Sequence, residues 1–125
     1  MNNPVHWFEI PVTDMDRAQK FYETVLDQKL DVRDFGNFVM AWFSSNPTQP
    51  GSGGTLIKAE SYVPSHEGSL IYFGVAEIND VLPRVEPAGG KVLNPKTSIG
   101  EYGHVAHFED TEGNRVAFHQ PPAGM

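Results

Sequence analysis

Two kinds of hydrophobic pattern follow each other along the N-terminal part of the chain. In residues 5–12 the side chains alternate with the period of two that a strand shows, and Phe8 and Ile10 lie on the more apolar face. Between Met15 and Leu26 the apolar residues recur at three- and four-residue spacing, which is typical of an amphipathic helix. The pattern therefore predicts a strand followed by a helix.

The rest of the chain continues this order and then repeats it. Strands are predicted at 30–35, 38–43 and 55–60, and again at 69–75, 91–93, 103–109 and 114–119 around a second helix. Pro83 lies in the second helical stretch, and because proline lacks a backbone N–H we expect that helix to begin late or to kink. We divide the chain into module one (residues 5–60), a linker (61–68) and module two (69–120), within one domain of 125 residues.

Local signals mark where these elements begin and turn. Thr13, followed three residues later by Asp16, resembles a capping box and predicts the start of the first helix. Gly36 with Asn37 predicts a turn between two strands. Residues 44–54 are polar and rich in proline and glycine, which predicts a long irregular loop.

Composition narrows the class of protein. A hydrophobic content of 39% and a charged content of 20% are typical of a soluble globular chain. No apolar run is long enough to span a membrane, the N-terminus shows no secretory signal, and the chain has no cysteine, so we expect a cytoplasmic protein without disulfides. The formal net charge of −7, with nine scattered basic residues, argues against nucleic-acid binding.

Strand alternation also predicts which side chains face away from the helices, into a cleft between the modules. Aligning Gly54 with Gly113 adds Leu56, Lys58 and Glu60 to this set. The polar and aromatic members are Trp7, Glu9, Lys58, Glu60, Tyr72, His107 and His119. A few polar groups among apolar walls are typical of a small-molecule pocket, in which we expect Trp7, Lys58 and Tyr72 to contact the ligand.

These residues also have purely structural interpretations. Glu9 could be exposed at a sheet edge, His107 could be a hydrogen-bonded structural histidine, and Lys58 could extend its ammonium group into solvent. Trp7 and Tyr72 are aromatic residues of a kind that more often serve packing. Only the joint convergence of the set favours a site.

Two motifs give the chain a family resemblance. They are D-x-x-R-A-x-x-F-Y at residues 14–22 and F-x-D-x-x-G-N at residues 108–114. With them, residues 5–120 resemble the vicinal oxygen chelate superfamily, which includes glyoxalase I, bleomycin-resistance proteins, fosfomycin-resistance transferases and extradiol dioxygenases. The resemblance implies an α+β fold in which two βαβββ modules form a cupped mixed sheet with the site in the cup.

The resemblance also implies where a metal would be held. Metal enzymes of that family carry ligands on the first and last strand of each module, and these points match Trp7, about Lys58, Leu70 and Ala117. An indole and two alkyl groups offer no lone pair, and lysine is normally protonated, so no metal is expected there. The resemblance also implies that His107 faces the cavity, because it falls where the fosfomycin-resistance enzymes carry a cavity-facing residue.

Three functions remain open at this stage. The first is a metal-free small-molecule protein with acid/base lyase or isomerase chemistry, in which Glu9 or His119 is the base, His107 is the acid and Lys58 holds a carboxylate or phosphate. The second is a sequestering protein of the bleomycin-resistance type, which binds its ligand without turnover. The third is a metalloenzyme with a displaced site formed by Glu9, His107 and His119.

We also expect a homodimer. A cupped sheet leaves outer strands with unpaired backbone groups, which natural proteins cover, and short two-module members of the resembled family usually pair. Val5, Phe38, Trp42 and Phe43 are candidate contacts because aromatic residues are enriched at interfaces. The alternative is a monomer kept apart by its negative charge.

Overall fold

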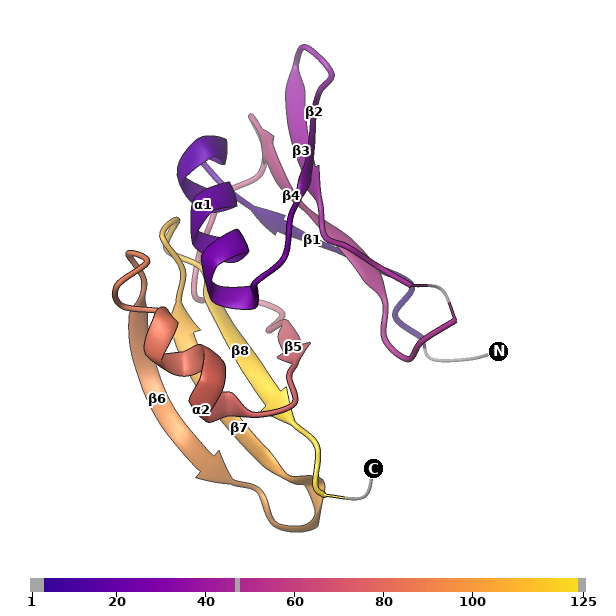
Figure 1. Cartoon of the computed structure of the whole chain (residues 1–125). Helices are drawn as coiled ribbons and strands as arrows, with labels where there is room; N and C mark the ends of the chain where they lie inside the picture. The colour runs from indigo at the N-terminus through magenta and orange to yellow at the C-terminus, as the bar shows by residue number, and fades with distance from the viewer. Residues whose placement is uncertain (1–3, 47, 124–125) are drawn as a thin grey trace.

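The computed structural model describes residues 4–46 and 48–123, which form two four-stranded sheets (Figure 1). Module one contains β1 (Trp7–Pro11), α1 (Met15–Leu26), β2 (Asp31–Asp34), β3 (Phe38–Trp42) and β4 (Gly53–Ala59). Module two contains β5 (Tyr72–Gly74), α2 (Ile78–Val81), a 3-10 turn (Leu82–Arg84), β6 (Lys91–Ser98), a second 3-10 turn (Gly100–Tyr102), β7 (His104–Glu109) and β8 (Arg115–Gln120). The predicted order of elements is confirmed in both modules.

The two sheets have the same topology. Their strand orders are β1-β4-β3-β2 and β5-β8-β7-β6. In each sheet the first strand of the module pairs in parallel with the last, and the remaining pairs are antiparallel. The fold is therefore α+β, with two βαβββ modules and mixed sheets as predicted.

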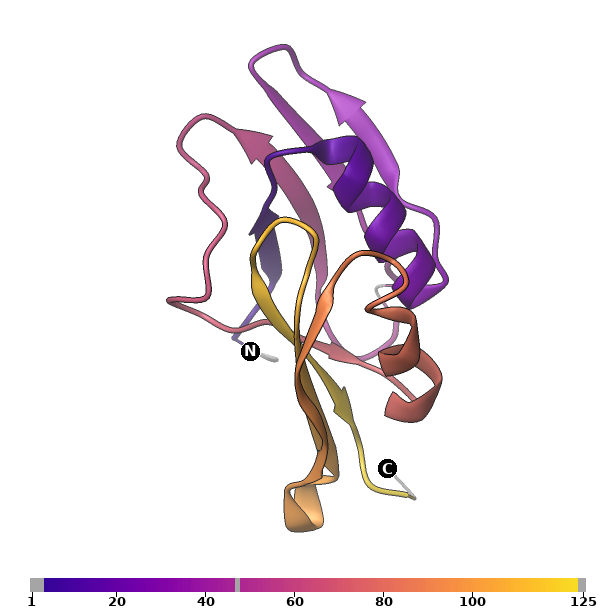
Figure 2. The same ribbon diagram turned by 90° about the vertical axis from the view of Figure 1, so that its left-hand side faces the viewer.

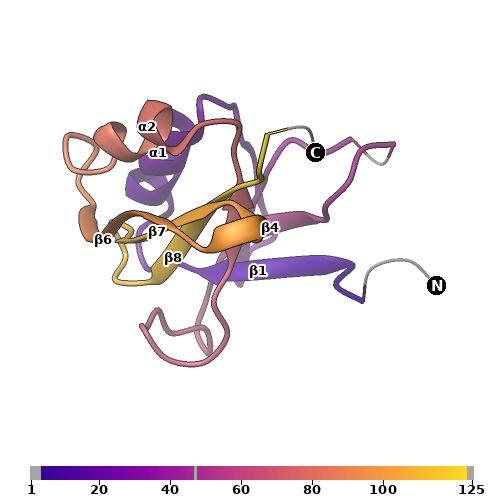
Figure 3. The same cartoon turned by 90° about the horizontal axis from the view of Figure 1, so that it is seen from below.

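Both helices lie on one side of the sheets, and the linker runs along the opposite side (Figures 2 and 3). On the helix side one apolar core extends through both modules. Phe8 of β1 meets Phe73 of β5 with ring centroids 6.0 Å apart, and Phe43 contacts both rings. Phe43 is only 8% exposed, so its predicted role at a dimer surface is wrong. Across the described ranges, no helix is long and apolar enough to cross a membrane.

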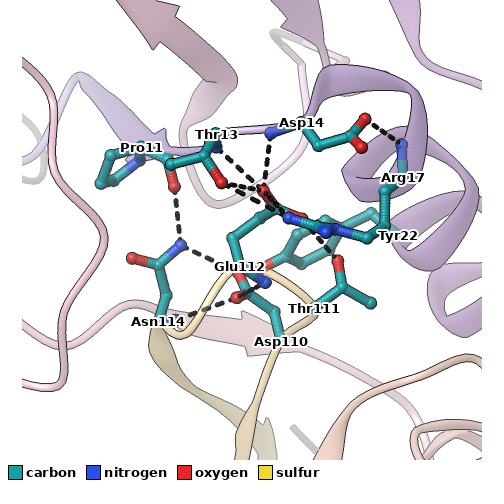
Figure 4. Close-up of polar contacts among 9 residues, drawn as sticks. All are labelled: Pro11, Thr13, Asp14, Arg17, Tyr22, Asp110, Thr111, Glu112 and Asn114. Carbon is teal, nitrogen blue, oxygen red and sulfur yellow. Dashed lines mark hydrogen bonds and ion pairs between the residues drawn. The ribbon is translucent and has the colours of Figure 1, made fainter. Parts of the chain in front are cut away.

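A buried carboxylate joins the β7–β8 turn of module two to the start of α1 (Figure 4). Glu112 Oε1 accepts hydrogen bonds from the backbone N–H groups of Thr13 and Asp14, at 2.9 and 2.8 Å. Arg17 Nε donates to Glu112 Oε2 at 2.7 Å, and the Glu112 side chain has no exposed surface. Burial alone would raise the pKa of Glu112, but the hydrogen bonds from Arg17, Asp14, Thr13 and Thr111 outweigh it and hold the pKa at about 2.

The same turn makes a second contact between the modules (Figure 4). Tyr22, fully buried in α1, donates its hydroxyl hydrogen to Asp110 Oδ2 at 2.5 Å. Asn114 donates through Nδ2 to the Pro11 carbonyl oxygen at 2.7 Å and to Asp110 at 3.0 Å. Because Asp110 and Asn114 belong to the F-x-D-x-x-G-N motif, this motif fixes how the modules join.

The helix ends differ in detail from the sequence prediction. The N-cap of α1 is Asp14, whose Oδ1 accepts from the Arg17 backbone N–H at 3.1 Å. Thr13 instead bonds Glu112, so the predicted capping box is wrong. The second helix does not begin late, because α2 starts at Ile78, before Pro83. It ends at Val81 and is followed by a 3-10 turn that contains this proline. β5 is shorter and β6 is longer than predicted.

Candidate functional site

The strand register defines the open face of module one, opposite the helices. Trp7 and Glu9 alternate with the buried Ile10, so they point away from α1. In the parallel β1–β4 pair, Glu9 lies beside Thr55 and Ile10 lies beside Leu56. Leu56 belongs to the helix-side core, whereas Thr55 shares the open face with Glu9.

Lys58 lies on the helix side of its sheet, so its predicted place in the cup is wrong. It is paired with Val39 and separated from the buried Leu56 by two residues, which gives it the same orientation. Leu56 is likewise not in the cup, and Glu60 lies beyond the end of β4. Lys58 lines a separate cavity of about 470 Å³, together with Val12 and other residues at the end of β4.

The error comes from the internal alignment of the two modules. Glu9 and Tyr72 are equivalent positions, three residues before Val12 and Val75 of the repeat, and they pair with Thr55 and Ala117 respectively. The strand pairs therefore match Thr55 with Ala117, which shifts the predicted alignment by three residues. A shift by an odd number exchanges the two faces of a strand.

The middle of the module-one open face is apolar. Trp42 lies beside Thr55, and Met40 lies beside Ile57, all facing away from α1. The Trp7 ring covers Gly53, where an added Cβ would lie 3.0 Å from the Trp7 Cζ3 atom. We call Trp7, Met40, Trp42 and Ile57 the apolar wall. Met40 and Ile57 were not among the predicted cleft residues, although alternation within 38–42 puts Met40 and Trp42 on one face.

Glu9 stands at the edge of the apolar wall and contacts the linker. The Tyr62 hydroxyl donates to Glu9 Oε1 at 2.9 Å, which is consistent with the linker lying on the open side (Figure 3). This hydrogen bond, together with the charge of the carboxylate, raises the pKa of Tyr62, so the phenol remains the donor at neutral pH. Glu9 therefore faces the cup as a hydrogen-bonded carboxylate.

Three side chains of module two form a second polar group, which we call the Tyr72–His107–Arg115 cluster. The Tyr72 Oη atom lies 3.3 Å from His107 Nε2, and the two rings meet edge to face. Arg115 donates to His107 Nδ1 from Nε at 3.2 Å and from Nη2 at 2.8 Å. Burial lowers the pKa of His107 and the Arg115 charge lowers it further, so the imidazole is neutral at pH 7.

His119 is on the same face of β8 but has a different partner. It pairs with Gly74 in the β5–β8 register, and its Nε2 donates to the Tyr102 carbonyl oxygen at 2.8 Å. This contact ties His119 to the turn before β7. The structure thus places His107 in contact with Tyr72 and Arg115. Glu9 and His119 instead form hydrogen bonds with Tyr62 and with the Tyr102 carbonyl group.

The residues of the cup do not fit the metal site that the family resemblance suggests. With the corrected register, the four matched positions hold Trp7, Thr55, Leu70 and Ala117. Thr55 Oγ1 is buried with no hydrogen-bond partner among the described residues, but one neutral hydroxyl cannot hold a metal alone. Nor do any three His, Asp or Glu side chains in the described ranges gather as a metal site requires, so Glu9, His107 and His119 form no displaced site.

Comparison with known proteins identifies the family. The model of the Glyoxalase/Bleomycin resistance protein/Dioxygenase superfamily matches residues 5–118, and the chain belongs to this superfamily. It is 32% identical to a glyoxylase-like domain-containing protein of Didymella fabae, with 94% of this chain and 93% of that protein covered. It is 27% identical to the putative glyoxylase CFP32 of Mycobacterium bovis, where the match covers 92% of this chain and 44% of the relative.

Solved structures show the same fold. Glyoxalase I from Zea mays aligns with a TM-score of 0.70 at 21% identity, over 94% of this chain and 46% of the maize chain. TnmS3, an antibiotic binding protein from Streptomyces, aligns with a TM-score of 0.66 at 20% identity, over 96% and 97% of the two chains. This chain therefore spans less than half of the mycobacterial relative and of the maize enzyme.

Proposed function

We propose that the cup binds a small organic molecule and moves a proton on it, as a lyase or isomerase of the glyoxalase-like family would. In the apolar wall Ile57 is buried, but Trp7, Met40 and Trp42 keep exposed surface for the hydrocarbon or aromatic part of such a ligand. Glu9 on one module and the Tyr72–His107–Arg115 cluster on the other supply the polar groups. No metal has a role in this proposal.

The observation that carries the proposal is the environment of His107. Its two ring nitrogens contact Arg115 and Tyr72 on the face of the module-two sheet that is opposite the helices, and the apolar wall lies on the corresponding face of the module-one sheet. Glu9 is the proposed base. His107 was expected to be the acid, but its ring is neutral, so the Tyr72 hydroxyl held beside it is the proposed proton donor. In place of Lys58, Arg115 supplies the positive charge that attracts a carboxylate or phosphate of the ligand.

Ligand screening followed by product analysis tests the proposal. Thermal shift against a panel of metabolites, including aromatic 2-oxo acids, should reveal a stabilising ligand. Mass spectrometry or NMR of that ligand after incubation should then show an isomer or an elimination product. Glu9→Gln should abolish turnover with an unchanged melting temperature, whereas Glu101→Gln, an exposed carboxylate on the turn before β7, should leave turnover intact. Full turnover in Glu9→Gln would contradict the proposed base.

A second candidate function is sequestration of a small molecule without turnover. The apolar wall favours it, because an aromatic surface binds planar drug-like molecules without any proton transfer. The net charge of −7 would attract a cationic ligand. Ligand-dependent stabilisation with no product after prolonged incubation would support this candidate over the enzyme.

We also propose that the protein is a cytoplasmic homodimer. The absence of cysteine fits a reducing compartment. β1, β2, β5 and β6 end their sheets, and Val5 and Trp7 near the start of β1 are 60% and 42% exposed, which supports pairing through an edge. Light scattering at tens of micromolar should give twice the chain mass of 13.9 kDa, and a mass of one chain would reject the dimer.

A further inference from the structure

Arg115 determines which nitrogen of His107 carries the proton. The guanidinium group has only donors, and two of them, Nε and Nη2, approach His107 Nδ1 at 3.2 and 2.8 Å. Nδ1 must therefore accept, which excludes a hydrogen on that atom. A neutral ring with a bare Nδ1 carries its hydrogen on Nε2.

This tautomer sets the direction of the next hydrogen bond. The Nε2–H group of His107 faces the Tyr72 hydroxyl oxygen at 3.3 Å, so Tyr72 is the acceptor in that contact. A phenol that accepts through its oxygen keeps its own hydrogen for another partner. Tyr72 is 46% exposed on the open face, so that hydrogen is available to a ligand bound there.

We propose that Tyr72 is a hydrogen-bond donor for an anionic oxygen of the ligand, and that Arg115 is a positioning residue acting through His107. This inference rests on the proposed ligand-binding cup and names its ligand class, an aromatic or other apolar molecule with a carboxylate or enolate oxygen. This ligand class is supported by the change from apolar side chains on module one to polar side chains on module two. The apolar wall of module one takes the hydrocarbon part, while the positive charge of Arg115 and the Tyr72 donor attract the anionic end.

The nearby carboxylate of Glu109 is compatible with Tyr72 as a donor to an anionic oxygen. Glu109 pairs with Arg115 in the β7–β8 register and shares its face, but its Oε1 contacts His66 of the linker at 2.9 Å. Among the described residues, the side-chain hydrogen bonds donated by Arg115 go to His107. The Glu109 carboxylate thus accepts a hydrogen bond from the linker, and Glu109 makes no described contact with the Tyr72 hydroxyl.

The tautomer can be measured without any ligand. Long-range ¹H–¹⁵N NMR of the full chain distinguishes a histidine protonated on Nε2 from one protonated on Nδ1. We expect the Nε2–H form for His107 in the wild type, a mixture of tautomers in Arg115→Gln, and recovery of the Nε2–H form in Arg115→Lys, whose ammonium can still donate. Arg33→Gln, on the open face of the other sheet, is the matched control and should leave the His107 signals unchanged. An Nδ1–H ring in the wild type would overturn the inference.

Ligand binding tests the donor itself, with phenylpyruvate and its neutral analogue phenylacetone as probes. Tyr72→Phe should weaken phenylpyruvate binding about tenfold, the usual effect of losing one hydrogen bond to a charged group, and change phenylacetone binding less than about threefold. Tyr102→Phe is the matched control, an exposed tyrosine at the turn before β7. Equal binding of both probes with no effect of Tyr72→Phe would overturn the donor and leave the cup standing. Binding of neither probe would reject the ligand class, while the NMR result would still report on Arg115.

Discussion

Arg17 of α1 and Glu112 of the β7–β8 turn are 95 residues apart in sequence, yet Nε and Oε2 lie 2.7 Å apart. The Arg17 side chain is half exposed, whereas Glu112 has no exposed side-chain surface. The pair is therefore a buried carboxylate held by donors of the other module, with the arginine at its outer edge. Such a carboxylate is stabilising only while it remains ionised and hydrogen-bonded.

Replacing Glu112 with glutamine should loosen the contact between the modules. The amide has the same shape, but it cannot accept at both oxygens and has no charge to balance Arg17. We expect the free energy of unfolding to fall by about 2 kcal/mol, the usual scale for lost hydrogen bonds to a charged group. Urea unfolding monitored by tryptophan fluorescence measures it, and Glu101→Gln, at an exposed site, should change the value by less than about 0.5 kcal/mol.

The same carboxylate predicts how stability depends on pH. The folded-state pKa of Glu112 is about 2, below its ordinary value of 4.5, so its contribution is fully present above pH 4.5 and is lost as pH falls toward 2. Asp110 acts in the opposite sense, because burial raises its pKa despite the hydrogen bonds it accepts. The comparison with Glu112→Gln isolates one group: the difference in unfolding free energy should shrink steadily between pH 4.5 and 2. A constant difference across this range would mean that Glu112 is not the titrating group.

The fold was predictable from the sequence because its signals are local. Alternation around Ile10 and helical spacing around Phe21 each depend on neighbouring residues, and both residues are buried as their patterns predict. The face of Lys58 was not predictable in this way, because it depends on the register between β1 and β4. The burial pattern of β4 does not indicate that register, because Thr55, Leu56 and Ile57 are all buried although only Leu56 lies on the helix side.

The hydrogen-bond partners of the polar residues in the cup could not be predicted from the sequence either. His107 and Arg115 are diagonal neighbours only because β7 and β8 form a hairpin, in which His107 pairs with Ala117 and Arg115 with Glu109. Their contact depends on rotamers rather than on pattern. Tyr62 reaches Glu9 because the linker crosses the open side of the sheets, a path that its composition does not specify. The sequence thus predicts the individual residues of the candidate site, but not which of them form hydrogen bonds with one another.

Gly54 should not tolerate a side chain, because its neighbour Phe8 occupies the space. A Cβ at Gly54 would fall well inside van der Waals contact of the Phe8 ring, which itself packs against Phe43 and Phe73. Gly54→Ala should therefore lower the free energy of unfolding by about 1–3 kcal/mol, the usual range for overpacking a core. Gly74→Ala is the control in β5, where an added Cβ meets no atom within 4 Å, and it should have little effect in the same urea titration. Equal losses in both variants would show that the Phe8 ring has room to move.

Lys58 and Arg115 should differ in their effect on ligand binding, because they lie on opposite sides of the sheets. Lys58 has the orientation of the buried Leu56, whereas Arg115 contacts His107 on the open face. Lys58→Gln should therefore leave the affinity for phenylpyruvate within about twofold of the wild type, while Arg115→Gln should weaken it about tenfold through the loss of charge and of the His107 contact. Isothermal titration calorimetry on the two variants makes the comparison, with the melting temperature as a check on folding. A loss of affinity in Lys58→Gln as large as that in Arg115→Gln would place the anion at the Lys58 cavity and not in the cup.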